Sequence, residues 1–493
     1  MIFSVILAPI MLSRLGLAAF GVWAVTGAFA TYATVFDLGI TRALGRYVAL
    51  YDASGEERKL RECVGLGLLA VTIVGAVVLA AAYLVAPLFA DSLGVLDTAD
   101  MRIVLLCSAG ILTSMLFKKV LNSVPHGLRR MVPPNVTSTA GNVVNFVFSV
   151  GILLVSSSLV DYALVNFLAA FLGIFGALAS TLYVSRPLPV AWPSRETTRE
   201  VLGFSIKVQV PWIADMVNQQ TDKLVIAFLI DVKVAAAFEI AGRVTNAVKA
   251  VGVLTTSAMV PTATAYIVER GRQAVPAFHL RYSRMSVALA FPLFVVVCVS
   301  APALLFAWLG EIPDTTEAVL IVLSVSHFFG LAAGVAVTLA MGAGRANMLA
   351  LTAALSAALN VVLTVAFAPL FGTWGVLAAT FVSIAFGAIA FLRNFHREFG
   401  IRGREFLAAI APPTALAVGV GVPFGLYALA FMELDSRLQA AVMLAAVTLL
   451  YGAIYWVLAS RLGYLPARLT LSRGRRAAPP RDEALVGTPE PTR

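Results

Sequence analysis

The sequence predicts an all-α polytopic membrane protein with about 14 transmembrane helices, built as two six-helix lobes related by pseudo-two-fold symmetry plus two C-terminal helices. The first observation is composition: of 493 residues, 60% are hydrophobic and 13% are charged, whereas soluble domains are about half apolar and a quarter charged. The second is that apolar residues recur in blocks of about 20, the helix length that crosses ~30 Å of hydrocarbon. The third is that the connections between these blocks are mostly short and polar.

The predicted spans lie near residues 1–15, 17–36, 63–86, 103–124, 134–156, 160–184, 204–230, 233–258, 284–307, 317–341, 347–369, 373–392, 406–431 and 438–460. The first span is short, because residues 2–13 cover only ~18 Å as a helix. We expect that the natural start of the chain lies upstream; a tilted first helix that continues through Leu15 and Leu17 is the alternative. No basic leader and no small-residue cleavage site follow Met1, so no signal peptide is predicted.

The positive charge of the chain, +10 overall, predicts its orientation in the membrane. With the N-terminus inside, 29 of the 36 Lys and Arg residues fall in cytoplasmic loops and the tail, whereas four lie outside and three within spans. This distribution follows the positive-inside rule and predicts both termini in the cytoplasm. A nucleic-acid partner is not expected, because it would need basic residues gathered on a folded soluble surface, and no soluble domain is predicted.

Two similar segments, one in each half of the sequence, predict how the chain is organised. LAAFGVWAV follows the first span and VAAAFEIAG follows the seventh, and cytoplasmic segments at residues 37–62 and 261–282 hold matching places after each, the first of them amphipathic. The predicted parts are an N-terminal lobe at 1–184, a cytoplasmic linker at 185–203, a C-terminal lobe at 204–392, two additional helices at 406–460 and a disordered cytoplasmic tail at 461–493. Substrate sites of transporters built from such repeats lie between the copies, near the midplane.

Polar residues concentrate in the seventh and eighth predicted spans. They are Asp215, Asn218, Gln219, Gln220, Asp222, Lys223, Glu239, Arg243, Asn246 and Lys249. An ionisable group in hydrocarbon costs roughly 3 kcal/mol on insertion scales, so such groups are expected to face a protein interior or a wet cavity. Most of them share one face of their helix. The alternative is that they pair with one another, as Glu239 and Arg243 can at i,i+4, and only hold two helices together.

The cysteines and histidines predict neither a disulfide framework nor a metal site. Cys63, Cys107 and Cys298 lie far apart, each in an apolar block, which is typical of small core residues. The histidines at positions 126, 279, 327 and 396 form no spaced cluster. No cofactor is expected, other than a coupling Na⁺ or H⁺.

Two stretches of the sequence resemble a known family. The segment PIMLSRLGLAAFGVWAVTGAFATYATVFDLGITRALGRYVA, and NQQTDKLVIAFL followed by FEIAGRV, resemble the opening and the seventh and eighth spans of bacterial polysaccharide repeat-unit flippases, of the O-antigen and exopolysaccharide type. These belong to the multidrug/oligosaccharidyl-lipid/polysaccharide (MOP) exporter superfamily, with the peptidoglycan-precursor flippases and the multidrug and toxin extruders. The resemblance covers residue 5 to about residue 460. It implies two lobes that open a central cavity alternately to either side, and a cargo on an undecaprenyl-type diphosphate carrier.

The cationic residues are predicted to hold the diphosphate. The resemblance implies cavity-lining cations at Arg14, at the outer end of the first span, and at Arg243 in the eighth. Arg243 also lies about ten residues into its span, ~15 Å deep, and its planar guanidinium suits phosphate oxygens. Lys223 and Lys249 would add charge on either side of it. The alternatives are that Arg243 neutralises Glu239 and that Lys223 snorkels outward.

The remaining polar residues are assigned to the sugar and to a coupling ion. Three consecutive amides offer donors and acceptors for sugar hydroxyls: Asn218, Gln219 and Gln220. Three carboxylates are candidates to bind a coupling proton or Na⁺ as the cavity reorients: Asp215, Asp222 and Glu239. For Asp215, acceptance of a backbone hydrogen bond is the alternative.

The sequence therefore predicts a flippase rather than an enzyme. It would move a polyprenyl-diphosphate-linked oligosaccharide from the inner to the outer leaflet of the bacterial cytoplasmic membrane for cell-surface polysaccharide biosynthesis, with the lobes rocking about the linker at 185–203. Its partners would be membrane lipids, the undecaprenyl-type carrier and the polysaccharide polymerase machinery. A cation-coupled multidrug or toxin extruder and a peptidoglycan-precursor flippase are the alternatives, and the intramembrane cations argue against the extruder. A membrane glycosyltransferase or polymerase fits poorly, because the outer loops are short.

Overall fold

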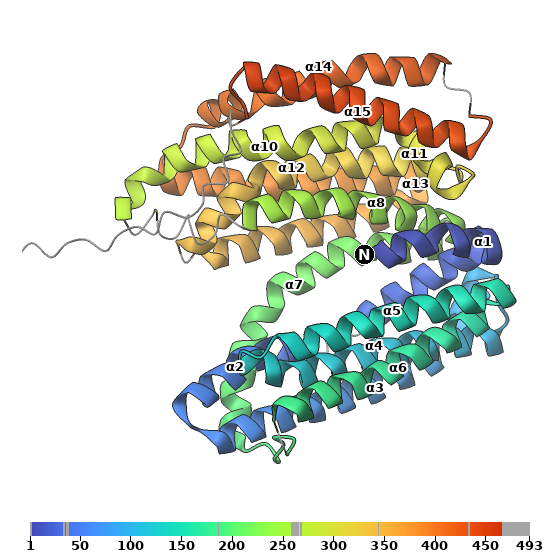
Figure 1. The fold of residues 1–493 in the computed structure, drawn as a ribbon, viewed down its shortest axis with the longest axis vertical. Coiled ribbons are helices and arrows are strands. Elements are labelled where there is room, and N and C mark those ends of the chain that lie inside the picture. The colour runs from blue at the N-terminus through green and yellow to red at the C-terminus, as the bar shows by residue number, and fades with distance from the viewer. Residues whose placement is uncertain are drawn as a thin grey trace, which may run out of the picture.

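The computed structural model confirms an all-α membrane protein (Figure 1). It describes residues 2–32, 35, 39–185, 187–257, 266, 269–343, 345–431 and 434–465. The helices are α1 (Ile2–Tyr32), α2 (Ile40–Ser54), α3 (Glu57–Leu93), α4 (Thr98–Gly127), α5 (Val132–Val155), α6 (Leu159–Val184), α7 (Arg195–Leu229), α8 (Val232–Ser257), the short 3₁₀ turn η2 (Arg272–Ala274), α10 (Val275–Val299), α11 (Ala301–Leu309), α12 (Thr316–Gly342), α13 (Ala346–Phe399), α14 (Gly403–Phe431) and α15 (Arg437–Arg461).

Among the described residues, ten helices are long and apolar enough to cross a membrane. Two of these ten, α1 and α13, each contain a glycine with a positive φ, Gly16 at 81° and Gly372 at 57°. Glycine adopts such backbone angles without steric cost, so each helix is divided there into two segments. Helices α7 and α8, with 35 and 26 residues, are also long enough to cross a membrane. They differ from the ten because they contain more polar residues. The divisions of α1 and α13 add two spans to the ten, and α7 and α8 add two more. Together they give the fourteen spans that the sequence predicts.

The chain reverses at both glycines. In α13, a Cβ at Gly375 would collide with the carbonyl of Phe367, and Ser356 donates a 2.7 Å hydrogen bond to the carbonyl of Ser383, so the two segments lie side by side. In α1, Ser4 and Phe20 lie on opposite sides of Gly16 in the sequence, yet both contact the side chain of Arg243.

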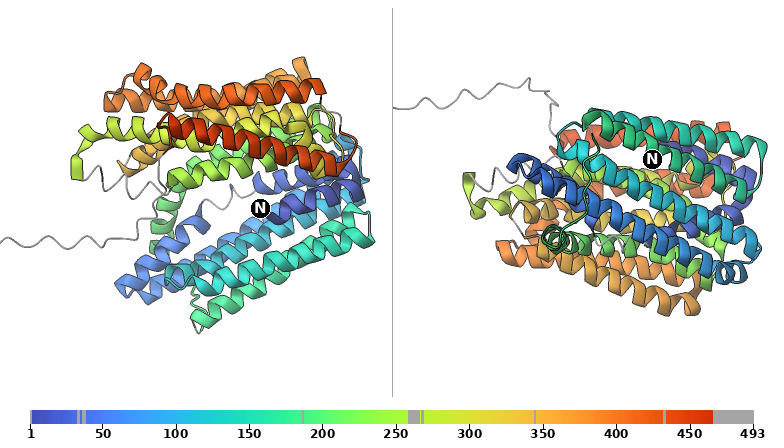
Figure 2. Two further views of the ribbon diagram at one scale, coloured as in Figure 1. Left: turned by 45° about the horizontal axis from the view of Figure 1, so that its top comes forward. Right: turned by 90° about the horizontal axis from the view of Figure 1, so that it is seen from below.

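The helices form two groups that lie side by side (Figures 1 and 2). In one group α4 packs against α2, α3 and α6, and α6 packs against α5. In the other, α10 packs against α8, α12 and α14, and α12 packs against α13. Helix α7 contacts α2 and α3 of the first group as well as α8 and α13 of the second, so it connects them. The lobe boundaries at 184 and 204 stay predictions.

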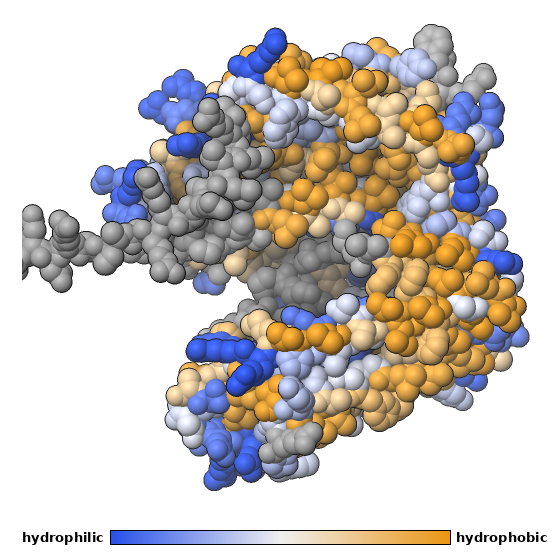
Figure 3. All heavy atoms as spheres, in the orientation of Figure 1, coloured by the Kyte–Doolittle hydropathy of each residue, from blue (hydrophilic) through white to orange (hydrophobic). Residues whose placement is uncertain are grey.

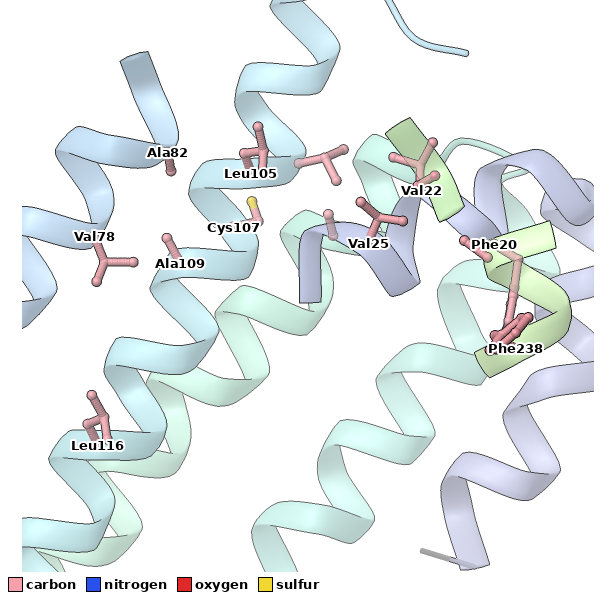
Figure 4. Close-up of a cluster of buried hydrophobic side chains, with 14 of the residues drawn as sticks. Phe20, Val22, Val25, Val78, Ala82, Leu105, Cys107, Ala109, Leu116 and Phe238 are labelled. Atoms are coloured by element: carbon pink, nitrogen blue, oxygen red, sulfur yellow. The ribbon is translucent and has the colours of Figure 1, made fainter. Parts of the chain in front are cut away.

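A hydrophobic cluster extends through the first group from α2 and joins it to the second group at the opposite end of the molecule. It combines buried residues of α1, α3 and α4 with residues of α8; Figure 4 shows Phe20, Leu105 and Phe238 among them. The approach is close, because a Cβ at Gly21 would collide with the carbonyl of Val232. Toward the other end, where α2 lies, the space-filling view shows a hollow between the groups (Figure 3).

Two boundaries differ from those that the sequence predicts. The amphipathic segment expected at 37–62 forms α2 only as far as Ser54, and residues from Glu57 onward already belong to α3. The linker expected at 185–203 is partly helical, because the side chain of Ser194 accepts a hydrogen bond from the Thr197 N–H and caps α7, which then begins at Arg195. The tail beyond residue 465 lies outside the described residues. So does most of the part of the segment expected at 261–282 that comes before residue 269.

Candidate functional site

A cavity of about 570 Å³ lies among α7, α8, α12 and α13, with the first turns of α1 at its side. The predicted site residues that line it are Gln220, Asp222, Lys223, Glu239, Arg243 and Lys249. Arg14 is exposed and is not among the lining residues, so its assignment to the substrate stays a prediction. Asp215, Asn218 and Gln219 belong to α7, and their side chains lie outside the described residues.

Two cations of the cavity converge on one carboxylate. The Nζ of Lys223 lies 2.6 Å from Oε2 of Glu239, and the Nε of Arg243 lies 3.1 Å from Oε1 of the same side chain. Lys223 also donates to Oε1 of Gln220, at 3.2 Å. The predicted i,i+4 pair of Glu239 and Arg243 is therefore present, and Lys223 points into the protein rather than snorkelling outward. Because two positive charges share one negative charge, this part of the cavity keeps an excess of positive charge.

Arg243 connects α8 to both segments of α1. Its Nη1 donates a 2.5 Å hydrogen bond to the carbonyl of Ser4, before the Gly16 turn. Its guanidinium carbon lies 5.1 Å from the centre of the Phe20 ring, after that turn. A guanidinium has five N–H donors, so Arg243 can bind Glu239 and Ser4 and still present donors to a ligand.

Asp222 lies in a separate, more deeply buried part of the lining. Its side chain is 5% exposed and accepts hydrogen bonds from Thr364 Oγ1 at 3.1 Å and from Thr380 Oγ1 at 2.6 Å, one from each segment of α13. Asn360 hydrogen-bonds to the same carboxylate, while its Oδ1 is buried without a partner among the described residues. A carboxylate, two hydroxyls and an amide oxygen are the ligand types that hard cations take, and the carboxylate can alternatively hold a proton.

Lys249 also lines the cavity, six residues beyond Arg243 on α8, and His327 of α12 lines it too. The sequence does not predict His327, Thr364 or Thr380 as site residues. A single histidine in an apolar span carries no spacing signal, and threonines in membrane helices usually bond to their own backbone. Only the packing of α12 and α13 against α7 and α8 brings these side chains to the cavity.

Outside the cavity, two histidines that are distant in sequence meet. The Nε2 atoms of His279 and His396 lie 3.1 Å apart, and Ser283 lies 3.2 Å from Nδ1 of His279. Among the described residues, no group of three or more His, Cys, Asp or Glu side chains could hold a metal ion. Cys63 and Cys107 are buried, Cys298 is partly buried, and all three are free, as the sequence predicts.

Comparisons with known proteins identify relatives of this fold. A family model described as "Polysaccharide biosynthesis protein" matches residues 1–267. No curated protein sequence matches the chain significantly. The solved structure of the Lipid II flippase MurJ in an inward closed conformation has a TM-score of 0.67 at 12% identity, and the match covers 92% of this chain and 98% of that one.

Two transporters of the MOP superfamily are also similar. An inward-facing multidrug resistance MATE family transporter has a TM-score of 0.64 at 16% identity, with 81% of this chain and 94% of that chain covered. A MOP superfamily transporter from Pyrococcus furiosus has a TM-score of 0.50 at 18% identity, with 81% and 95% covered. At these identities the likeness shows a shared fold.

Proposed function

The chain belongs to the polysaccharide biosynthesis protein family and has the fold of the MOP transporters, and from this we propose that it is a flippase for a polyprenyl-diphosphate-linked oligosaccharide. It would move this glycolipid from the inner to the outer leaflet of the bacterial cytoplasmic membrane, for cell-surface polysaccharide biosynthesis. The observation that carries the proposal is the pair of cations, Lys223 and Arg243, in a cavity formed by membrane helices.

In this proposal the diphosphate takes the place of the Glu239 carboxylate as the partner of Lys223 and Arg243. Its oxygens accept hydrogen bonds from the Arg243 guanidinium and the Lys223 ammonium, and such charge-assisted bonds are roughly twice as strong as neutral ones. Glu239 offsets part of the charge of the two cations while the cavity is empty, which lowers the cost of keeping them among membrane helices. When the diphosphate enters, Glu239 loses its partners and becomes a candidate to take up a proton.

The direction of opening agrees with entry from the cytoplasm. The hollow lies toward the end where α2 and the start of α7 lie, which positive-inside charge predicts to be cytoplasmic. The opposite end is closed by the hydrophobic cluster that joins α1, α4 and α8. We therefore interpret the arrangement as inward-facing, with the outward-facing state requiring α1 and α8 to separate at that cluster.

Asp222 is our candidate for the coupling-ion site. A Na⁺ between its carboxylate, the hydroxyls of Thr364 and Thr380 and the amide oxygen of Asn360 would bind α7 to both segments of α13. The buried Oδ1 of Asn360 has no partner in the part of the chain that the structure describes, and rotation of this amide by 180° would turn its oxygen toward the carboxylate. A proton on Asp222 would instead let the carboxyl donate to a neighbouring oxygen.

Two alternatives share this fold. A cation-coupled drug extruder is compatible with the buried Asp222, but the positive excess at Lys223 and Arg243 disfavours a cationic drug. A peptidoglycan-precursor flippase would use the same diphosphate contacts, and the Lipid II flippase MurJ matches this chain over 98% of its own length. The two flippase functions differ in the group that the diphosphate carries, so substrate comparison separates them.

The test is transport by the purified protein in proteoliposomes. A fluorescent polyprenyl-diphosphate oligosaccharide is placed in the membrane, and its accessibility to a quencher on each side is followed over time. Lipid II and a cationic dye are assayed in parallel. Movement of the oligosaccharide without dye efflux supports the proposal. Movement of lipid II alone would identify a peptidoglycan-precursor flippase, and dye efflux alone would identify an extruder.

A further inference from the structure

We infer that the cavity holds a second anion subsite, formed by Lys249 and His327, that binds an acidic group on the transported oligosaccharide. The inference rests on the proposed function and deepens it, because it specifies an acidic saccharide, carrying a carboxylate or a phosphate, as the cargo. Both residues line the cavity, Lys249 from α8 and His327 from α12.

Lys249 has no carboxylate counter-ion among the described residues. The two carboxylates of the cavity have other partners: Glu239 is bound by Lys223 and Arg243, and Asp222 by threonine hydroxyls. In the part of the chain that the structure describes, no carboxylate forms an ion pair with Lys249. A lysine near the middle of a membrane helix costs roughly 3 kcal/mol on insertion scales. An anion supplied by the ligand would offset this cost.

His327 faces the same cavity from another helix. It lines the cavity from α12, as Lys249 does from α8, and its ring centre lies 6.5 Å from that of Phe294. Among the described residues, no carboxylate forms an ion pair with either side chain. An anion between them would accept a hydrogen bond from the ammonium and another from the imidazole N–H.

Lys249 lies apart from the residues proposed to bind the diphosphate. Arg243 and Lys249 are six residues apart on one helix, which is ~9 Å along its axis. Charge-assisted hydrogen bonds are about 2.7–2.9 Å long. When each side chain extends perpendicular to the helix axis, one phosphate group therefore cannot bind both of them. Asn246 lines the cavity between them. Its amide suits sugar hydroxyls, and this order predicts a diphosphate, then a sugar, then an acidic group.

The experiment compares two glycolipids of equal length, one neutral and one with a single uronic acid, in the same proteoliposomes. We expect the wild-type protein to move the acidic glycolipid roughly 10-fold faster or more, the range of one or two hydrogen bonds to a charged group. Lys249→Gln and His327→Gln should each bring the ratio of the acidic to the neutral rate close to one, because only the acidic glycolipid gains a charged contact at this subsite. Lys233→Gln is the matched control, because Lys233 is an exposed lysine at the other end of α8, and it should preserve the preference.

Equal rates for the two glycolipids in the wild-type protein would overturn the inference. So would a Lys249→Gln variant that slows both glycolipids equally, because the lysine would then serve the diphosphate or a phospholipid headgroup. A second measurement separates this inference from the proposed function: calorimetric binding of the free acidic and neutral oligosaccharides, without diphosphate or lipid. If no glycolipid moves, the flippase proposal fails, but acidic-sugar binding that depends on Lys249 would still support the subsite. Equal binding of the two sugars would contradict it.

Discussion

At the scale of single residues, Glu239 determines how the cations of the cavity are used. It binds Lys223 and Arg243 at the same time, at 2.6 and 3.1 Å. The side chains of all three are between 15% and 21% exposed, so they are neither fully dry nor free in water. In such surroundings the two ion pairs gain less than in a dry interior, and a diphosphate with more charge can replace the carboxylate.

Substitution of Arg243 tests whether it holds the diphosphate. Arg243→Ala removes the donors to the phosphate and leaves Glu239 with Lys223 alone, so we expect transport to fall roughly 100-fold. Arg243→Lys keeps the charge but loses the planar fork, so part of the activity should remain. The measurement is the initial flipping rate in proteoliposomes, with exposed Arg130→Ala as the control. Wild-type rates in the alanine variant would remove Arg243 from the mechanism.

Asp222 allows a separate test of ion coupling. Asp222→Asn preserves the size of the side chain and its acceptor for Thr380, but removes the charge that would hold Na⁺ or the group that would take a proton. We expect a folded protein whose transport no longer responds to an imposed sodium or pH gradient, a loss of roughly tenfold or more in the driven rate. Asp231→Asn, an exposed carboxylate in the connection before α8, is the control. A gradient response that survives in Asp222→Asn would exclude this residue as the coupling site.

The sequence predicts the polar face of the seventh span but not what binds to it. Thr364 and Thr380 lie 142 and 158 residues from Asp222 along the chain, and no local spacing connects them. The pair of Glu239 and Arg243 could be predicted, because i,i+4 residues on a helix are always neighbours. Lys223 as the second partner of Glu239 could not, since it depends on how α7 packs against α8.

At the scale of elements, α7 is fixed to different partners along its length. Near its start, the buried carboxylate of Glu62 in α3 accepts hydrogen bonds from Ser194 at 2.5 Å and from Thr197 at 2.6 Å. Further along, Asp222 is bound to α13. The end of the predicted linker at 185–203 is thus attached to α3 through Ser194 and Thr197, and rocking of the lobes about this linker stays a prediction.

The contact between α1 and α8 gives a prediction about the closed end. A Cβ at Gly21 would collide with the carbonyl of Val232, so Gly21→Ala must push these helices apart. Overpacking of this kind costs about 1–3 kcal/mol, and we expect a lower melting temperature in detergent. Gly27→Ala in the same helix is the matched control, because no atom lies within 4 Å of a Cβ there, and helix propensity favours alanine. Equal melting temperatures for the two variants would contradict the close approach.

At the scale of the whole molecule, hydropathy predicts the number of crossings because lipid imposes one length on every span. It separates α1 and α13 into two spans each, and the glycines at 16 and 372 allow the reversals. Hydropathy does not predict which spans become neighbours, since lipid-facing and protein-facing apolar residues have the same composition. The meeting of Phe20 with Phe238 in one cluster, or of His279 with His396, therefore appears only in the folded chain (Figure 4).

Alternating access predicts that the closed end must open in each cycle. Phe89 of α3 and Phe228 of α7 pack there with ring centres 4.9 Å apart. In a background without the native cysteines, Phe89→Cys and Phe228→Cys joined by a short cleavable thiol crosslinker should stop transport in proportion to the crosslinked fraction. Cleavage of the linker should restore the rate. The control pair is Phe329→Cys with Phe381→Cys, whose rings lie 5.7 Å apart between α12 and α13 within one group of helices. Because that pair need not separate, its crosslink should leave transport unchanged. Full transport with residues 89 and 228 joined would mean that the glycolipid crosses without opening of this end.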